Sequence, residues 1–474
     1  MNALQGIDIR GVAYDSRQVK PGDVFIALQG LKAAGSDFAA DAIGRGAVAV
    51  VADRPADSPT SVPWVVVADA RAAMATIAAE FYGHPSRSMQ VVGITGTNGK
   101  TTTAYLLRAV FESAGKKCGL LGTVTYSVGN EELPASRTTP EAPDVQRMFR
   151  QMVDAGCEAC VMEASSHALV LRRVDATAFA AGVFTNLTRD HLDYHGDMES
   201  YFAAKKRLFE MLPPGAPAII NLDDPRGESL RRTVSAPVSY AINKPADVTP
   251  GPLTLTFNGL EFTARTPKGD VHVTSRLVGR PNVSNILATV AAATALDIPA
   301  SAIERGLASL IHVPGRFELV SGSTDDVTVV IDYAHTDDAL KNLLETARPL
   351  APGRIITVFG CGGDRDRTKR PLMGAVAARL SDIVVITSDN PRSEDPARII
   401  EEIKRGVPAA SDRGAVTFAI VDRTEAIQFA IRKAEPGDLV LLAGKGHEQM
   451  QEIGGKQLPF NEAAIARDAL ERRR

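Results

Sequence analysis

A glycine-rich segment that leads directly into lysine and threonine is the strongest chemical signal in the sequence. It reads GITGTNGKTTT and overlaps the apolar, β-rich residues 91–94. Apolar side chains at Leu107, Val110 and Phe111 then fall on one face of a predicted helix. A strand, a glycine loop and a helix N-terminus together bind phosphate through backbone N–H groups and the helix dipole. The segment predicts a nucleotide site formed by Gly96, Thr97, Asn98, Gly99, Lys100, Thr101 and Thr102.

Lys100 and Thr101 carry the reactive side chains of this loop. A lysine here can reach the terminal phosphates of a nucleotide, and a threonine hydroxyl can bind Mg²⁺. The glycine spacing is shorter than in the usual loop G-x-x-x-x-G-K-[ST], because Ile94 stands where the first glycine is expected. The alternative is an ordinary strand–helix turn with a surface lysine, and the complete strand–loop–helix context disfavours it.

Three further side chains could support phosphate chemistry. Glu163 ends the apolar run CVME and should emerge at the carboxyl edge of a parallel sheet, where ligands bind. His191 follows another strand-like run, AGVFTNL, and Lys205 lies in the helical segment YFAAKKRLF. Taken singly, each has a plain alternative: a solvated carboxylate, a packing or capping histidine, and a surface lysine.

Two other patterns predict no such site. Cys157 and Cys160 form a C-x-x-C pair, but no second pair completes a zinc site, so we expect two reduced thiols. The stretch GCGGDR is similar to a dinucleotide-binding fingerprint. Arg365 stands in place of its third glycine, however, which excludes an NAD site.

The elements that position these residues fall into three α/β segments, as the length also suggests. Short strands and helices in residues 1–86 predict a small N-terminal α/β domain. Alternating strands and helices in residues 87–313 predict a central domain on a parallel, P-loop-type sheet that carries the nucleotide site, with an antiparallel patch near residues 250–275. Strand ends followed by loops and amphipathic helices in residues 314–474 predict a C-terminal Rossmann-like α/β domain.

Composition limits the partners of the protein. Of its 474 residues, 45% are hydrophobic and 23% are charged, and the formal net charge is −3. Because there is no global basic field, we expect no binding to nucleic acid. The N-terminus lacks a signal-peptide pattern, and no apolar run reaches the roughly 18 residues of a membrane span. We therefore expect a cytoplasmic monomer that does not insert into membranes.

Together with more distant segments, the short phosphate loop resembles the Mur ligase family, the ATP-dependent amino acid ligases of peptidoglycan precursor synthesis. The resemblance covers nearly the whole chain. The matching pieces are DSRQVKPGDVF, GITGTNGKTTT, RTTPEA, EASSHAL, NLTRDHLDYHGDMESYFAAKKRLF, GRPNVSN, PGRFE, IDYAHT, FGCGGDRDRTKRP, DNPRSEDP and GKGHE.

This resemblance implies a two-step reaction. ATP, the co-substrate, phosphorylates the D-glutamate carboxylate of UDP-N-acetylmuramoyl-L-alanyl-D-glutamate. The amine of meso-2,6-diaminopimelate then attacks the acyl phosphate and forms an amide, with two Mg²⁺ ions as cofactors. A lysine-adding ligase of the family and a folylpolyglutamate synthetase-like ligase are the alternatives, and the YDSR and DNPR segments speak against both. A non-catalytic nucleotide-binding scaffold is disfavoured because the lysine and metal positions are all present.

The resemblance also implies roles around the phosphates. Lys100, Lys205 and His191 would be catalytic. Thr101 and Glu163 would bind one Mg²⁺, and His191 would help to bind a second. Lys205 would carry a carbamate made from CO₂, which turns a cation into an anion that can bind metal.

Further contacts with the nucleotide and with the UDP-linked peptide are carried over in the same way. Asn285 would contact adenine, and Arg316 and Asp332 would approach the nucleotide from the third domain. Residues 31–33 match another uridine contact, although Leu-Lys-Ala replaces a more polar triplet there. The implied contacts of the UDP-muramoyl-dipeptide are Ser16, Thr138, Thr139, Ser165 and Arg173.

The third domain should select the incoming amino acid. Arg392 ends the turn DNPR after the strand-like run DIVVITS, and its planar guanidinium can bind a carboxylate through two parallel hydrogen bonds. Meso-diaminopimelate has a second carboxylate at its far end and lysine does not, so Arg392 favours diaminopimelate. Gly444 and Glu448 would bind the distal ammonium group. The implied set is Arg365, Asp389, Asn390, Pro391, Arg392, Gly444 and Glu448.

Overall fold

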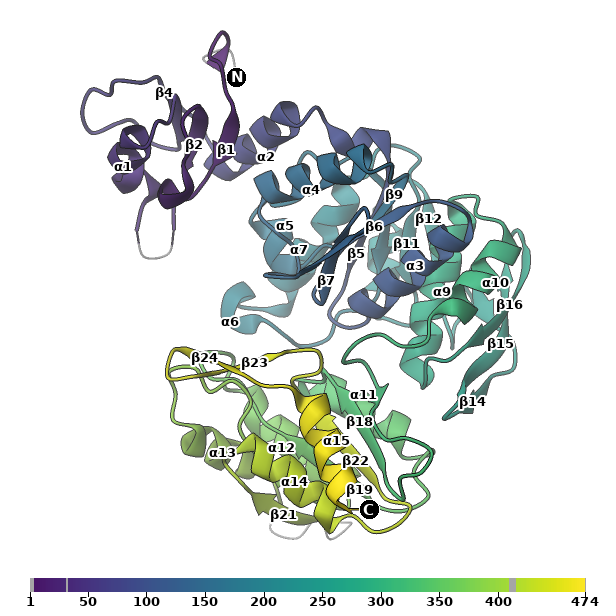
Figure 1. The fold of residues 1–474 in the computed structure, drawn as a ribbon. Helices are drawn as coiled ribbons and strands as arrows, with labels where there is room; N and C mark the ends of the chain where they lie inside the picture. Colours follow the sequence, from purple (N-terminus) through teal and green to yellow (C-terminus); the bar gives the residue numbers. More distant parts are fainter. Residues whose placement is uncertain (1–3, 31–32, 409–414, 474) are drawn as a thin grey trace.

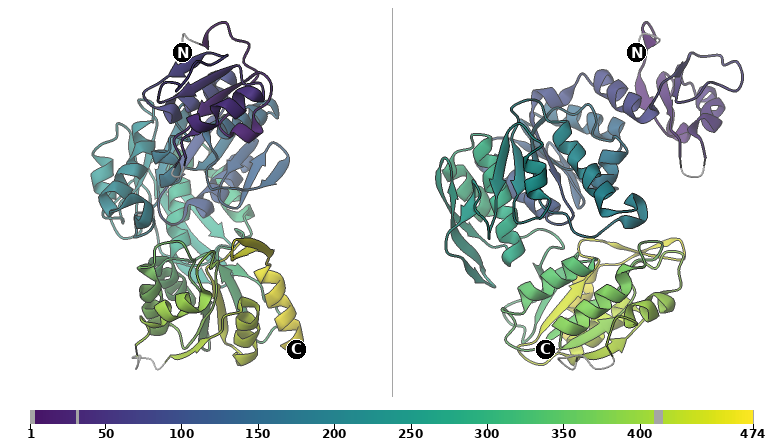
Figure 2. Two further views of the ribbon diagram at one scale, coloured as in Figure 1. Left: turned by 90° about the vertical axis from the view of Figure 1, so that its left-hand side faces the viewer. Right: turned by 180° about the vertical axis from the view of Figure 1, so that it is seen from behind.

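The computed structural model describes residues 4–30, 33–408 and 415–473. The chain forms three α/β domains, each built on its own main sheet, with the N-terminal domain at one end and the C-terminal domain at the other (Figures 1 and 2). The predicted fold class is confirmed. The exact boundaries, 1–86, 87–313 and 314–474, stay a prediction.

The N-terminal domain has a four-stranded parallel sheet in the order β1-β2-β3-β4. Helix α2 packs on α4 of the central domain, and the Tyr14 hydroxyl donates to Asp144 Oδ2 at 2.7 Å, so this domain is tied to its neighbour. The elements are β1 (Gly11–Ala13), β2 (Asp23–Ala27), α1 (Ala39–Gly44), β3 (Ala49–Ala52), β4 (Trp64–Val66) and α2 (Ala70–Phe81).

The central domain has an eight-stranded sheet in the order β12-β11-β10-β5-β9-β6-β7-β8. All neighbours pair in parallel except β7 and β8 at one edge. Its strands are β5 (Gln90–Thr95), β6 (Cys118–Leu121), β7 (Thr125–Val128), β8 (Glu131–Pro134), β9 (Ala159–Glu163), β10 (Phe179–Phe184), β11 (Ala218–Asn221) and β12 (Pro237–Tyr240). Its helices are α3 (Lys100–Ser113), α4 (Ala142–Asp154), α5 (Ser166–Val170), α6 (Leu192–His195), α7 (Met198–Glu210), α8 (Gly227–Arg231), α9 (Arg280–Ala295) and α10 (Ala300–Ser309).

Apolar side chains cover both faces of this sheet, as a parallel sheet requires. One core joins the sheet to α3, α9 and α10, and the other joins it to α4 and α7. The predicted antiparallel patch is present beside α10. It consists of β13 (Thr249–Pro250), β14 (Thr254–Thr256), β15 (Gly259–Thr266) and β16 (Gly269–Ser275).

The C-terminal domain has a six-stranded sheet in the order β17-β18-β22-β19-β20-β21, parallel except at β17. A two-stranded hairpin follows β22. The strands are β17 (Glu318–Leu319), β18 (Thr328–Asp332), β19 (Ile355–Phe359), β20 (Ile383–Ile386), β21 (Val416–Ala419), β22 (Leu439–Ala443), β23 (Met450–Ile453) and β24 (Lys456–Pro459). The helices are α11 (Asp337–Ala347), α12 (Lys369–Leu380), α13 (Pro396–Lys404), α14 (Arg423–Lys433) and α15 (Glu462–Arg473).

Two smaller expectations can be compared with the structure. All four cysteines are buried free thiols, which agrees with the reduced C-x-x-C pair. Among the described residues, the structure has no helix with the length and apolar character that crossing a membrane demands.

Candidate active site

The glycine loop joins the central strand β5 to helix α3, as the sequence predicts. Gly96 and Gly99 both have positive φ, +150° and +86°, which side chains rarely adopt. A Cβ on Gly96 would lie 1.8 Å from the Thr185 hydroxyl, and one on Gly99 would lie 2.3 Å from Asn285 Oδ1. The loop therefore needs both glycines to pass close to its neighbours and open toward a ligand.

Lys100 is half-buried at the first position of α3. Its Nζ donates to the carbonyl oxygens of Gly96 and Thr97, each at 2.8 Å. Burial lowers the pKa of Lys100, and the nearby carboxylates of Glu163 and Asp190 act in the opposite direction. Its ammonium group is thus held over the loop by neutral acceptors, which phosphate oxygens could replace.

Glu163 is the last residue of β9, the strand next to β5, and its side chain is buried. Its Oε1 accepts from the backbone N–H of Thr123 at 2.8 Å, and its Oε2 accepts from the Thr123 hydroxyl at 3.0 Å. That hydroxyl also lies 3.0 Å from the hydroxyl of Thr138. The sequence analysis did not select Thr123, because only the fold brings it to Glu163.

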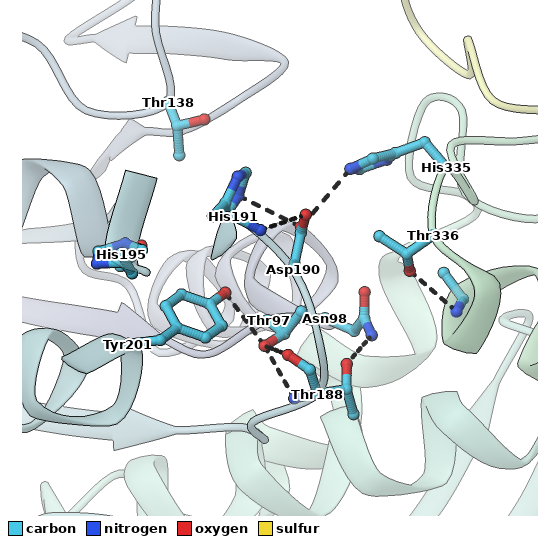
Figure 3. A network of polar contacts seen from close by, with 12 residues as sticks. Thr97, Asn98, Thr138, Thr188, Asp190, His191, His195, Tyr201, His335 and Thr336 are labelled. Atoms are coloured by element: carbon cyan, nitrogen blue, oxygen red, sulfur yellow. Dashed lines mark hydrogen bonds and ion pairs between the residues drawn. The ribbon is translucent and has the colours of Figure 1, made fainter. Parts of the chain in front are cut away.

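His191 lies at the N-cap of α6 with φ +53°, and its neighbour Asp190 links two domains (Figure 3). Asp190 Oδ2 lies 3.3 Å from His191 Nε2 and 3.9 Å from Nε2 of His335 in the third domain. Burial lowers the pKa of His191 to about 3. Burial disfavours the Asp190 carboxylate, but His191, His335 and Lys369 outweigh this effect and lower its pKa.

Asp190 is a partly buried acid that none of the sequence predictions includes. It directly precedes His191 inside the quoted motif NLTRDHLDYHG, so its position beside a proposed metal ligand was the available signal.

Lys205 is buried on α7 beneath the phosphate loop, with 1% of its surface exposed. Its Nζ donates to the Gly96 carbonyl at 2.8 Å and lies 4.1 Å from the centroid of the Tyr201 ring. The Tyr201 hydroxyl is 3.2 Å from the Thr97 hydroxyl (Figure 3). Within the described part of the chain, no carboxylate forms an ion pair with Lys205. Burial, and then the charge of Lys100, lower its pKa well below the usual value.

A cavity of about 290 Å³ lies where these groups meet the third domain. A second cavity, of about 590 Å³, shares Asn98, Gly99 and Asn285 with it and extends toward α11. The selected residues that line the first cavity are Thr97, Asn98, Gly99, Lys100, Thr101, Thr102, Thr138, Glu163, Ser165, His191, Asn285, Arg316 and Asp332.

Arg316 and Asp332 come to this cavity from the C-terminal domain. A guanidinium nitrogen of Arg316 donates to the Thr101 hydroxyl at 3.3 Å, and the group lies 4.4 Å from the ring centroid of Tyr333. Asp332 accepts from two backbone N–H groups, those of Phe317 at 2.7 Å and Ala334 at 2.8 Å. Burial raises the pKa of Asp332.

The residues selected for the UDP-linked peptide divide between two places. The Thr139 hydroxyl donates to the Glu163 carbonyl at 2.7 Å, and Arg173 donates to the Thr139 carbonyl at 3.1 Å, so both lie next to the cavity wall. Ser165 caps α5 and lies 3.3 Å from the Thr139 hydroxyl. Ser16 is buried in the N-terminal domain and is not among the described lining residues. In the neighbouring segment 31–33, residues 31 and 32 lie outside the described residues.

The residues selected for the amino acid form a separate cluster at the ends of β20 and β22. Asn390 Nδ2 donates to Glu448 Oε2 at 2.8 Å, and a Cβ on Gly444 would lie 2.7 Å from Asp389 Oδ2. Arg392, with φ +52°, donates to the Gly363 carbonyl at 2.7 Å.

Arg365 is more exposed, and its side chain donates to no described group besides the carbonyl of Asp364. Of the part of the chain that the structure describes, no residue selected for the amino acid lines either cavity.

Comparisons with known proteins agree with this architecture. Models of the Mur ligase family catalytic domain, the Mur ligase middle domain and the Mur ligase glutamate ligase domain match residues 8–82, 94–293 and 315–446. Two similar curated proteins are UDP-N-acetylmuramoyl-L-alanyl-D-glutamate--2,6-diaminopimelate ligases. The one from Geobacter metallireducens is 49% identical, covering 96% of this chain and 93% of the relative. The one from Alkaliphilus metalliredigens is 43% identical, covering 98% of this chain and 93% of the relative.

Solved structures give the same result. A structure of a UDP-N-acetylmuramoyl-L-alanyl-D-glutamate--2,6-diaminopimelate ligase matches with a TM-score of 0.68 and 34% identity, covering 98% of this chain and 95% of that one. MurF from Acinetobacter baumannii matches with a TM-score of 0.68 at 19% identity, covering 98% of this chain and 94% of the MurF chain. The second match speaks for the fold alone.

Proposed function

The chain belongs to the Mur ligase family, and from that membership we propose that it joins meso-2,6-diaminopimelate to the D-glutamate of UDP-N-acetylmuramoyl-L-alanyl-D-glutamate at the expense of ATP. One observation gives the main support for a ligase reaction. The phosphate loop, the peptide-facing Thr138 and Ser165, and Arg316 and Asp332 of another domain all line one cavity, so that a nucleotide and an acceptor can meet there. The names of relatives that match nearly the whole chain support the choice of substrates.

In the first step, a carboxylate oxygen of the substrate D-glutamate attacks the γ-phosphorus of ATP. The bond to the bridging oxygen breaks, and ADP leaves with that electron pair. Lys100 stabilises the charge that develops on the phosphoryl oxygens, and Arg316 reaches the same end of α3 from the third domain.

In the second step, an uncharged amine of diaminopimelate attacks the carbonyl carbon of the acyl phosphate. The tetrahedral intermediate collapses, phosphate leaves with its bonding electrons, and the nitrogen loses a proton to give the amide. Because water would also attack the acyl phosphate, the domains should enclose it.

The side chains at the cavity fit Mg²⁺ that is bound partly by substrate. Glu163 offers a buried carboxylate and Asp190 a partly buried one, and Thr101 offers a hydroxyl. Across the described ranges, no three His, Cys, Asp or Glu side chains form a complete cage, and Mg²⁺ commonly keeps waters and phosphate oxygens as ligands. We assign Thr101 and Glu163 to one ion, and His191 with the Lys205 carbamate to a second. Bound Mg²⁺ would neutralise phosphate charge.

The surroundings of Lys205 favour carbamate formation. A lysine reacts with CO₂ as the free amine, and burial beside Lys100 lowers the pKa of Lys205. The amine nitrogen would bond to the carbon of CO₂ and release one proton. The resulting anion would relieve the repulsion between Lys205 and Lys100.

The remaining assignments divide the substrates among the three domains. We assign the UDP-linked peptide to domain 1–86 through Ser16, and to Thr138, Thr139, Ser165 and Arg173 of the ATP-binding domain 87–313. Domain 314–474 would bind diaminopimelate through the Arg392 cluster. The enzyme would act as a monomer in the cytoplasm, which sedimentation and cell fractionation can test.

A phosphate-release assay tests the proposal. The purified protein is given ATP, Mg²⁺ and the UDP-linked dipeptide with a panel of amino acids. We expect phosphate release with diaminopimelate and much less with lysine. A preference for lysine would identify the lysine-adding alternative, turnover of a folate with glutamate would identify the folylpolyglutamate-like one, and no ADP with any acceptor would refute the ligase.

A further inference from the structure

Lys445 is a fully buried lysine of the GKGHE segment that has no part in the reaction steps above. We infer that it is a positioning residue for amino-acid selection: it fixes Asn390 and Glu448 so that one oxygen of Glu448 is left for the distal ammonium group of the substrate. This inference rests on the proposed function, since it concerns the same amino-acid site.

The Lys445 ammonium group uses all three of its N–H donors. Its Nζ lies 3.1 Å from Asn390 Oδ1, 2.8 Å from Glu448 Oε2 and 2.8 Å from the Met450 carbonyl oxygen. A buried charge is costly unless it is paired and hydrogen-bonded, and here it is both. The three acceptors come from the turn after β20, the turn after β22 and strand β23, so one cation joins three segments.

The contact with Lys445 decides the orientation of the Asn390 amide. Asn390 Oδ1 accepts from Lys445 Nζ and from the backbone N–H of Glu452 at 3.0 Å. Two donors on one side require an oxygen there, so the amide nitrogen must point the other way. It donates to Glu448 Oε2 at 2.8 Å.

Glu448 therefore has two unequal oxygens. Oε2 accepts from both Lys445 and Asn390, whereas Oε1 accepts no hydrogen bond from the residues that the structure describes. The Glu448 side chain is 30% exposed although Lys445 is not exposed at all. The carboxylate is thus anchored at Oε2 by a buried lysine while part of its side chain stays exposed, which leaves Oε1 for an incoming ammonium group.

Strand β23 supports the same turn from the other side. The Arg392 N–H donates to the Glu452 carbonyl at 3.0 Å, and the Gly454 N–H donates to the Arg392 carbonyl at 2.7 Å. The carbonyl of Asp389 accepts from the buried side chain of Gln451 at 2.7 Å. Since the backbone of the turn has these ties of its own, loss of the Lys445 charge should disturb the side chains of Asn390 and Glu448 first.

The test compares Lys445→Met with Lys456→Met in the full-length enzyme. Methionine keeps the length of the lysine chain without its charge, and Lys456 is an exposed lysine of the adjacent β23–β24 hairpin. For Lys445→Met we expect the KM for diaminopimelate to rise about 10- to 100-fold, because one partner of a buried charge pair is lost. We expect the KM for ATP and for the UDP-linked peptide to change less than about twofold, and Lys456→Met to match the wild type.

A second background separates positioning from general destabilisation. If Lys445 acts through Glu448, then adding Lys445→Met to Glu448→Gln should raise the KM for diaminopimelate less than about threefold further. The inference would be overturned if Lys445→Met raised the KM for diaminopimelate by the same factor in the wild type and in Glu448→Gln. An unchanged KM in the single variant would also overturn it. Should Lys445→Met not fold, Lys445→Gln is measured in the same way, with the same expectation.

The outcome for the wild type keeps the two proposals apart. If the wild-type enzyme does not turn over diaminopimelate, the proposed function fails. If it does and the Lys445 variants keep the wild-type KM, only the positioning role fails.

Discussion

Two buried lysines, one beneath the phosphate loop and one in the amino-acid site, lie in opposite surroundings. Among the residues that the structure describes, Lys205 has a single carbonyl acceptor and the face of Tyr201, with another lysine nearby. Lys445 has three acceptors, including the Glu448 carboxylate. Burial without a counter-charge destabilises the ammonium form, whereas a bonded carboxylate stabilises it. The first setting favours a lysine that reacts or binds anions, and the second favours one that holds its neighbours in place.

Lys100, like Lys205, donates to backbone carbonyl oxygens that phosphate oxygens could replace, and its removal should have the largest effect. We expect Lys100→Ala to lower kcat about 10³-fold, because the charge that develops on the phosphoryl group loses its fixed cation. ADP formation with all three substrates measures this. Near wild-type turnover would mean that Lys100 is only a structural lysine, like Lys445. The two surroundings would then not distinguish reactive lysines from positioning ones.

Lys205→Met should have the next largest effect, a loss of about 10²-fold in kcat if a carbamate takes part in phosphoryl transfer. The neighbouring Lys206, which forms an ion pair with Glu210 at 3.6 Å, provides the control, and Lys206→Met should remain active. A carbon-13 NMR signal from labelled bicarbonate should appear in the wild type and be absent from Lys205→Met. A signal of equal strength in the variant would place the carbamate elsewhere.

The sequence predicts the local parts of this site well and the long-range parts poorly. The strand, glycine loop and start of α3 follow from apolar periodicity and from the loop glycines. Two of these glycines, Gly96 and Gly99, have positive φ in the structure. Thr123 lies 40 positions from its partner Glu163, and Lys445 lies 55 positions from Asn390. No local pattern marks such pairs, because only the packing of different strands brings them together.

The same limit applies to whole segments. The DNPR and GKGHE motifs were each recognised, but their meeting at the ends of β20 and β22 depends on sheet order. That order places β19 between these two strands. The connections between parallel strands are compatible with several strand orders, so the sequence alone does not determine which strands are neighbours.

Arg392 tests whether a cation that is already paired can still select the substrate. Its Nε lies 3.4 Å from Glu452 Oε2, so a substrate carboxylate would have to compete with that glutamate. We expect Arg392→Lys to raise the KM for diaminopimelate about tenfold, since lysine cannot form two parallel hydrogen bonds with a carboxylate.

The KM for lysine as substrate should change little in this variant, because lysine lacks the far carboxylate. Equal increases for both amino acids would assign Arg392 to the turn itself and not to specificity.

The smallest effect concerns His447, two residues after Lys445. It is a base that forms no ion pair with an acid in the described ranges of the chain. Its ring centroid lies 5.1 Å from that of Tyr333, and burial, followed by the charge of Arg316, lowers the pKa of His447 to about 4 from an ordinary 6.5. Between these two values the unfolded chain binds more protons than the folded one. The resulting stability is complete above pH 6.5 and is lost as the pH falls toward 4, by at most about 1.4 kcal/mol per pH unit.

His447→Gln should therefore flatten the decline in the free energy of unfolding between pH 6.5 and 4, measured by denaturant titration at several pH values. His272→Gln, at an exposed position on β16, should leave the decline as it is in the wild type. If both variants decline as steeply as the wild type, His447 is not kept neutral by burial.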